Sequence, residues 1–275
     1  MLHHAQVGKL KSSQSYDFTY NRRITNTIGQ YVEFNITIEN ESYTVTLNRE
    51  AKENGEILMG EIIDFLSILN KKKRQQQLWM ERIWQWADQF DIEEYNVPRN
   101  RDELLNLTHL SFQSISYYER KKFTELPKEF GNLTKLKFLE LGSIVHEEIV
   151  LNNLTKLPME IGNLTELSHL HIQVNNLNEL PKEIGNLTQL KDLKLGCNHL
   201  TELPKEIGNL KQLEILTMWQ NEITELPPEI GNLKQLKGFS IWGNPLVELP
   251  QEIVNLTELK KIELGKNLRF SKLQK

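Results

Sequence analysis

The sequence predicts an α/β solenoid, with a parallel sheet on its concave side and short helical turns on its convex side. Leu-Pro pairs recur every 23 residues from Leu157 to Leu249. Each pair is followed by a strand-like Leu-x-Leu core, and a non-repeating segment precedes the whole array. A fixed period of this length is typical of stacked repeats that bury one continuous core.

The unit from Leu180 to Glu202 (LPKEIGNLTQLKDLKLGCNHLTE) shows why each repeat should fold this way. Leu193 and Leu195 are separated by one residue, so both point inward from a short strand. Asn198 falls where the chain turns, and we expect its side chain to satisfy buried backbone groups of the neighbouring turn. The Pro-x-Glu-Ile-Gly-Asn-Leu stretch predicts one or two helical turns on the convex side.

Seven such units are predicted across residues 97–267, followed by a tail over residues 268–275. The first two units are longer, 29 and 31 residues, and carry insertions near residues 117–120 and 144–150. The last unit lacks a following repeat, and Leu268, Phe270 and Leu273 are expected to cover it incompletely. We therefore expect an exposed edge or a dimer contact there.

The pattern LPxEIGNLxxLxxLxLxxNxL resembles the leucine-rich-repeat family, in particular its 23-residue subclass of Ras-group and bacterial proteins. The resemblance covers about 170 of the 275 residues. It implies a solenoid fold and the binding of a protein partner on the concave sheet. Because one fold serves many functions, it does not identify the partner.

The N-terminal segment is predicted to contain two regions before the repeats. Residues 1–22 are polar and are expected to be poorly ordered. Residues 23–96 are expected to form a β-hairpin over residues 31–47 and then one long helix or two amphipathic helices. The helix carries Trp79, Trp84 and Trp86 next to the first repeat, so we expect it to cap the stack. A small separate domain with its own partner is the alternative.

Charge and cysteine usage limit the possible functions. The formal net charge is −4, and the one basic run, Lys71 to Arg74, has acidic neighbours, so no nucleic-acid partner is expected. No apolar stretch is long enough for a membrane span, and the N-terminus has no secretory signal. The single cysteine, Cys197, cannot form an internal disulfide. A cytoplasmic location, or export as an effector without a cleavable signal, is expected.

Candidate binding residues lie at the outward positions of the predicted strands. Trp219 and Trp242 occupy equivalent positions in adjacent repeats and should lie side by side, with Ile215 extending the apolar patch. Repeat packing does not require tryptophan there, and exposed aromatic pairs are favoured as binding anchors. The alternative is that each indole only covers the other or the backbone.

A second group of candidates is polar and lies in earlier repeats. His169 and His171 share one strand face, with Asp192 and Lys194 on the next strand and Phe138 on the preceding one. Two histidines and one aspartate could bind a metal, but the adjacent Lys194 argues against it, so polar contact with the partner is expected. Tyr117 and Tyr118, in the first insertion, are expected to form part of a lip over the sheet.

No catalytic motif accompanies these residues. The chain has no Gly-rich phosphate loop, no HExxH and no CxxC, and Cys197 has no base fixed nearby by spacing. We therefore expect a binding module that needs no cofactor and is not an enzyme. Two alternatives are an immunity-type inhibitor that blocks one enzyme or toxin, and a bacterial effector whose N-terminal segment is active.

Overall fold

The structure, a computed structural model, describes the chain in several stretches. These are residues 6–11, 17–23, 31–38, 41–48, 55–112, 121–145, 148–150 and 152–265. Side chains are described from residue 65 onward, apart from residues 113–120, 143–151 and 266–275. The chain divides into two compact units, Met1–Leu78 and Trp79–Lys275, and each is treated by itself.

The first unit contains a four-stranded antiparallel sheet. Its strands β1 (Gln6–Lys11), β2 (Asp17–Arg23), β3 (Tyr31–Ile38) and β4 (Glu41–Asn48) follow one another in sheet order. The expected hairpin is the β3–β4 pair. Two strands that were not expected, β1 and β2, precede this hairpin. Composition gave no sign of these strands, because β1 pairs with β2 and β2 with β3 through backbone hydrogen bonds that form whatever the side chains are.

One long helix, α1 (Gly55–Gln89), takes the place of the one or two helices that the pattern allowed. The polar run Lys71 to Gln77 stays helical, because lysine, arginine and glutamine are good helix formers. None of the helices in the described stretches combines the length and the hydrophobicity needed to cross a membrane.

The end of α1 caps the second unit, as expected. Met80, Ile83, Trp86 and Ala87 are buried in the same apolar core as Leu110. The Trp86 ring packs edge-on against three phenylalanines at centroid distances of 5.0 to 6.4 Å, namely Phe112, Phe123 and Phe130. Its indole nitrogen donates a hydrogen bond of 3.0 Å to a backbone carbonyl, that of Glu125. The indole therefore covers the first two repeats without leaving its own polar atom unpaired.

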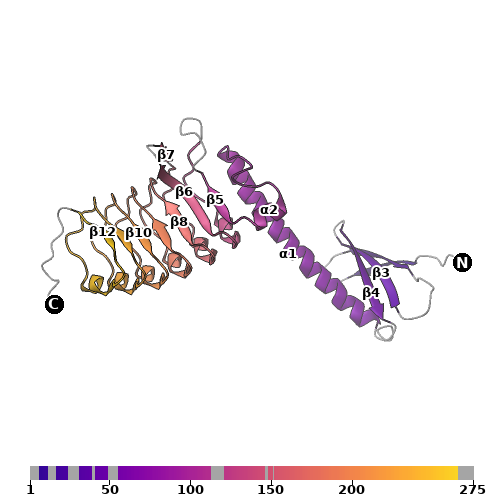
Figure 1. Ribbon diagram of the computed structural model, residues 1–275. Coiled ribbons are helices and arrows are strands. Elements are labelled where there is room, and N and C mark those ends of the chain that lie inside the picture. Colours follow the sequence, from indigo (N-terminus) through magenta and orange to yellow (C-terminus); the bar gives the residue numbers. More distant parts are fainter. Residues whose placement is uncertain are drawn as a thin grey trace. The chain divides into compact units, whose positions relative to one another are not determined.

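The repeats form one parallel sheet of seven strands within the described residues (Figure 1). In chain order these are β5 (His109–Ser111), β6 (Phe138–Val145), β8 (His169–Ile172), β9 (Asp192–Lys194), β10 (Ile215–Thr217), β11 (Gly238–Ser240) and β12 (Lys261–Glu263). Each strand pairs with that of the next unit, as the 23-residue period requires. The fold is therefore the predicted solenoid.

The convex side carries one short helical turn per unit (Figure 1). The first unit has a one-turn α-helix, α2 (Arg101–Leu105). The others have five-residue 3-10 helices: η2 (Lys128–Asn132), η3 (Met159–Asn163), η4 (Lys182–Asn186), η5 (Lys205–Asn209), η6 (Pro228–Asn232) and η7 (Gln251–Asn255). A proline precedes each 3-10 helix with φ between −62° and −66°. This angle is fixed by the proline ring, so the residue starts the turn at little entropic cost.

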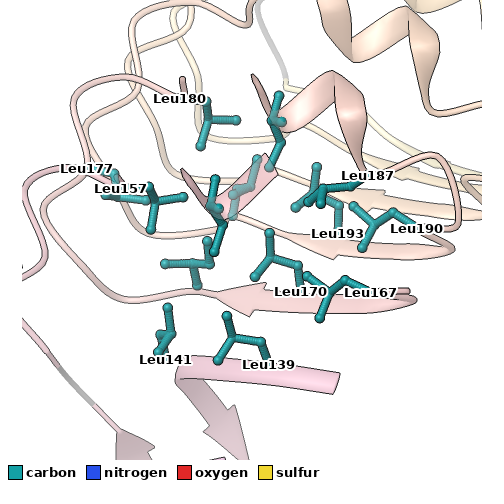
Figure 2. Close-up of a cluster of buried hydrophobic side chains, with 14 of the residues drawn as sticks. Leu139, Leu141, Leu157, Leu167, Leu170, Leu177, Leu180, Leu187, Leu190 and Leu193 are labelled. Atoms are coloured by element: carbon teal, nitrogen blue, oxygen red, sulfur yellow. The ribbon is translucent and has the colours of Figure 1, made fainter. Parts of the chain in front are cut away.

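The core between the two sides consists largely of leucines in layers (Figure 2). Leu170, Leu190, Leu193 and Leu195 are fully buried, and equivalent residues repeat along the stack. Each layer is covered by the layers of its neighbours. A single unit would leave most of its leucines in water, so stability comes from stacking.

A ladder of asparagines joins the turns of successive units. The Asn198 amide oxygen accepts from the backbone N–H of Leu177 at 3.0 Å. Its amide nitrogen donates to the carbonyls of Ile172, at 2.8 Å, and Leu195, at 3.0 Å. Asn175, Asn221 and Asn244 make equivalent bonds. The predicted role of Asn198 is confirmed: it satisfies buried backbone groups of two units.

The second insertion extends the sheet as a hairpin. Strand β6 continues to Val145 and pairs with the antiparallel strand β7 (Glu148–Val150). The β6–β8 register shifts between Glu140 and Gly142, so the insertion begins at a bulge. Bulges of this kind bend a strand and redirect the residues that follow.

The last described unit is covered less well than the others. Ile262 is 41% exposed, whereas its equivalents Leu193 and Leu216 are fully buried. Val254 stands where the preceding convex turns have glycine, and it is 67% exposed. The expected covering residues, Leu268, Phe270 and Leu273, lie outside the described residues.

The asparagine ladder leads to a prediction about stability. Asn198→Ala leaves the N–H of Leu177 and two carbonyls without their partner, so the free energy of unfolding should fall by about 2–4 kcal/mol. Urea unfolding followed by circular dichroism measures this change. Asn178→Ala, an exposed asparagine in the same region, is the matched control. Equal stability of the two variants would contradict the assigned role.

Candidate functional site

The outward side chains of the sheet stand in columns, and we call the surface that they form the concave face. The strand register places the first column as His109, Phe138, His169, Asp192, Ile215, Gly238 and Lys261. It places the second as Ser111, Glu140, His171, Lys194, Thr217, Ser240 and Glu263. Neighbours in a column belong to neighbouring repeats.

Trp219 and Trp242 stack on each other, two residues beyond the second column. Their ring centroids are 5.2 Å apart and the ring planes differ by 5°. Trp219 is half-buried, and Trp242 is 38% exposed. The structure thus brings the two predicted anchors together and leaves indole surface accessible.

The pair rests on Gly196 of the preceding repeat. A methyl group on Gly196 would lie 2.5 Å from Cε2 of the Trp219 ring, closer than any real contact. The indole therefore lies directly on the glycine backbone. Spacing alone did not indicate this support, although Gly196 shares the tryptophans' position in its own repeat.

Ile215 lies on the outward side of β10, in the first column. Thr217 separates it from Trp219 along the outward side of β10, and its neighbour across the sheet is Gly238. Its side chain is 39% exposed. Ile215 therefore presents exposed apolar surface on the concave face, and its contribution to the tryptophan patch stays a prediction.

The histidines and Phe138 form an aromatic group over the earlier strands. Phe138 is stacked on His109 at a centroid distance of 6.1 Å and contacts the His171 ring edge-on at 5.2 Å. It also lies 5.8 Å from the His169 ring. The predicted residues Phe138, His169 and His171 are thus brought into contact.

His171 is buried between two carboxylates. Its Nε2 lies 3.1 Å from Oδ2 of Asp192, and its Nδ1 lies 3.7 Å from Oε1 of Glu140. Ser111 donates a hydrogen bond of 2.5 Å to Oε2 of Glu140, and Nζ of Lys194 lies 3.6 Å from Oδ2 of Asp192. Glu140, His171 and Asp192 are each less than 10% exposed. We call these five residues the ionic network. The register indicated that Glu140 would lie beside His171 but not that it would be buried.

The pKa values of the two histidines are shifted in opposite directions. Burial alone lowers the pKa of His171, but its hydrogen bonds to Asp192 and Glu140 outweigh this and raise the pKa above its ordinary value. Burial lowers the pKa of His169, and the charge of nearby His171 lowers it further, against the opposing effect of Asp192. The surrounding carboxylates therefore favour the charged form of His171 more than that of His169.

The ionic network is built as a set of pairs. Within the described stretches no cluster of histidine, cysteine, aspartate and glutamate is arranged to hold a metal ion. Oδ1 of Asp192 is buried without a hydrogen-bond partner among the described atoms. Lys194 lies on the other oxygen of the same carboxylate, where a cation already balances the charge.

Cys197 lies where the chain turns after strand β9. Its backbone has φ of 53°, the left-handed region, and its Sγ donates to Oε1 of Gln220 at 3.0 Å. Burial raises the pKa of the thiol, which reduces the thiolate needed for nucleophilic attack. His199, two residues after Cys197, is paired with Glu222, its Nδ1 lying 2.9 Å from Oε1.

The remaining candidates are Tyr117 and Tyr118, in the first insertion. Both lie outside the described residues, so their expected position over the sheet stays a prediction.

Comparison with known proteins identifies relatives by sequence and by structure. The family model of the leucine-rich repeat region matches residues 90–198, 148–219 and 182–274. Among curated proteins, no match to the chain was found.

Solved structures similar to the chain come from plants and bacteria. A plant peptide hormone receptor, RGFR1 in complex with RGF2, is 34% identical, with a TM-score of 0.48 over 58% of this chain and 24% of the receptor. A leucine-rich-repeat protein of Leptospira interrogans is 33% identical, with a TM-score of 0.44 over 64% of this chain and 53% of that protein. The chain thus spans between a quarter and about half of the length of these two proteins.

The ionic network leads to a prediction about pH. A histidine whose folded-state pKa is raised stabilises the fold fully below its unfolded pKa, and this contribution is lost as the pH rises through the folded value. The free energy of unfolding should therefore fall between pH 6 and pH 8 more steeply in the wild type than in His171→Gln. Urea unfolding at several pH values measures both slopes. His199→Gln, at an exposed histidine, is the control, and parallel slopes for wild type and His171→Gln would refute the prediction.

Proposed function

This chain belongs to the leucine-rich-repeat family, and on that basis we propose that it is a protein-interaction module that binds a partner on its concave face. A shared fold alone does not establish a binding site, so specific residues must support one. The stacked, partly exposed pair of Trp219 and Trp242 is the observation that supports the proposal most directly.

The tryptophans are unusual because the solenoid does not need them. The inward side chains already form a buried core. Trp219 and Trp242 lie on the solvent side of the sheet and add nothing to that core. Tryptophan in a fixed position loses little conformational entropy on binding and offers a large contact area. Support from Gly196 below and stacking between the rings hold both indoles in place before a partner arrives.

The polar half of the face is proposed to assist recognition. Asp192 and Lys194 lie one strand from that of Trp219. His169 and His171 lie two strands away, and Phe138 lies three strands away. Asp192 holds His171 and Lys194 by a hydrogen bond and an ion pair, and complementary polar groups on a partner would then gain specificity more than affinity. Tyr117 and Tyr118 are proposed to contact the partner from the first insertion.

We propose that this protein acts by binding, without a cofactor and without catalysis. The raised pKa and turn position of Cys197 support this for the one thiol of the chain. A reducing compartment such as the cytoplasm is the proposed location. Proteins of oxidising compartments commonly use disulfides, and the single cysteine of this chain cannot form one internally. An inhibitor that blocks an enzyme with the same face would depend on the same residues.

The proposal predicts which variants lose the partner. The double variant Trp219→Ala and Trp242→Ala removes the anchors and should weaken partner binding by at least about 2 kcal/mol, or about thirtyfold. Quantitative mass spectrometry of proteins retained from native lysate by full-length wild-type and variant chains measures the loss.

Met159→Ala is the matched control, since this convex side chain is 59% exposed and lies away from the sheet. Circular dichroism establishes that all three chains are folded. Proteins retained equally by all three, with none lost on removing the tryptophans, would argue against the concave face as the binding surface.

A further inference from the structure

The concave face has an open gap above Gly238. The nearest atom to a methyl group built on this residue is Cγ1 of Ile215, 3.9 Å away. By contrast, the same construction at Gly196 meets the Trp219 ring at 2.5 Å. The Trp219 ring therefore fills the space over Gly196, whereas the space over Gly238 is open.

The walls of this gap come from the neighbouring strands. Ile215 of β10 and Lys261 of β12 lie opposite Gly238 in the register. Ile215 is 39% exposed, and Lys261 is held by Glu263, its Nζ lying 2.8 Å from Oε1. The gap thus has the apolar side chain of Ile215 on one side, and Lys261 is its neighbour in the register on the other.

A row of lysines borders the same face. The residue that precedes each first-column position is a lysine in four repeats, namely Lys137, Lys191, Lys237 and Lys260. Backbone hydrogen bonds of 2.8 Å link the last three through Glu214, which ion-pairs with Lys237 at 2.6 Å. We call this row the lysine edge. It gives one border of an acidic protein, of net charge −4, a local positive character.

The lysine edge, the gap and the tryptophans lie in order along one strand. Lys237 precedes Gly238, and Trp242 follows four residues later. At about 3.3 Å per residue, the gap and Trp242 are about 13 Å apart, a distance that four residues of an extended peptide span. One extended segment can therefore reach all three features.

Building on the proposed function, we propose that the partner offers an acidic segment with one apolar side chain that fills the gap above Gly238. Its carboxylates face the lysine edge, and its apolar side chain packs on Ile215. A bulky apolar residue about four positions away packs on the tryptophan pair. Charge complementarity selects an acidic segment over a basic one, and the gap selects a side chain larger than alanine.

Gly238→Val tests this proposal without disturbing the fold. The built methyl group has ordinary contacts only, and valine favours a strand. Randomised 12-residue peptides displayed on phage are selected on the immobilised full-length wild type. Enriched peptides are then measured by fluorescence polarisation against the variants. Peptides with an apolar residue among acidic ones should bind Gly238→Val at least tenfold more weakly and Gly238→Ala with an intermediate loss.

Charge reversal tests the second half of the proposal. Lys191→Glu with Lys260→Glu should weaken the same peptides at least tenfold. Lys182→Glu with Lys205→Glu, two exposed lysines of the convex turns, makes the same charge change and should leave binding within twofold. Thr188→Val, also exposed on the convex side, is the control for introducing valine.

The outcomes separate this proposal from the function on which it is based. Peptides that lose binding when Trp219 and Trp242 are replaced, but not in Gly238→Val or the lysine reversal, overturn the acidic-segment proposal and leave the proposed function standing. Selection of basic peptides instead of acidic ones would also overturn the acidic-segment proposal and leave the proposed function standing. Peptides indifferent to every concave substitution, or no enrichment over the bare support, overturn both.

Discussion

Each repeat buries its leucines against the repeats on either side, and the same neighbours must also satisfy the backbone groups that this burial removes from water. Leu193 is buried by adjacent layers, while Asn198 joins the turn of its own unit to that of the preceding one. An unpaired buried backbone group costs about 1–3 kcal/mol, so an asparagine recurs at this place in the regular units. Where the 23-residue period holds, equivalent residues of neighbouring units lie in register.

The two ends of the stack meet this constraint differently. At the first repeat, Trp86 and neighbouring residues of α1 provide the missing layer, and the indole nitrogen finds a backbone acceptor. At the last described unit, Ile262 occupies an inward position but keeps substantial exposure. The cap therefore contributes to stability in the way that another repeat would, because it buries apolar surface and leaves its polar atoms paired.

Since the leucines and asparagines determine packing, the outward positions are free to vary, and the concave face has two different halves. Around His171, charged groups are buried and bonded to one another, which leaves few of them to meet a partner. Around Gly238, Ile215 and Trp242, apolar surface is exposed and space is open. Apolar contact that removes exposed area from water contributes more to affinity than exchange of satisfied polar bonds, so the second half is better suited to anchor a partner.

The sequence alone determined the solenoid, its strand register, the asparagine ladder and the adjacency of Trp219 and Trp242, because a strict period makes equivalent residues neighbours in space. It did not reveal strands β1 and β2, whose pairing depends on backbone contacts that composition does not report. Nor did it show that Glu140 is buried beside His171, or that side-chain atoms cover Gly196 and leave Gly238 open. These features depend on side-chain directions and on which neighbour occupies each space, and only the tertiary structure decides those.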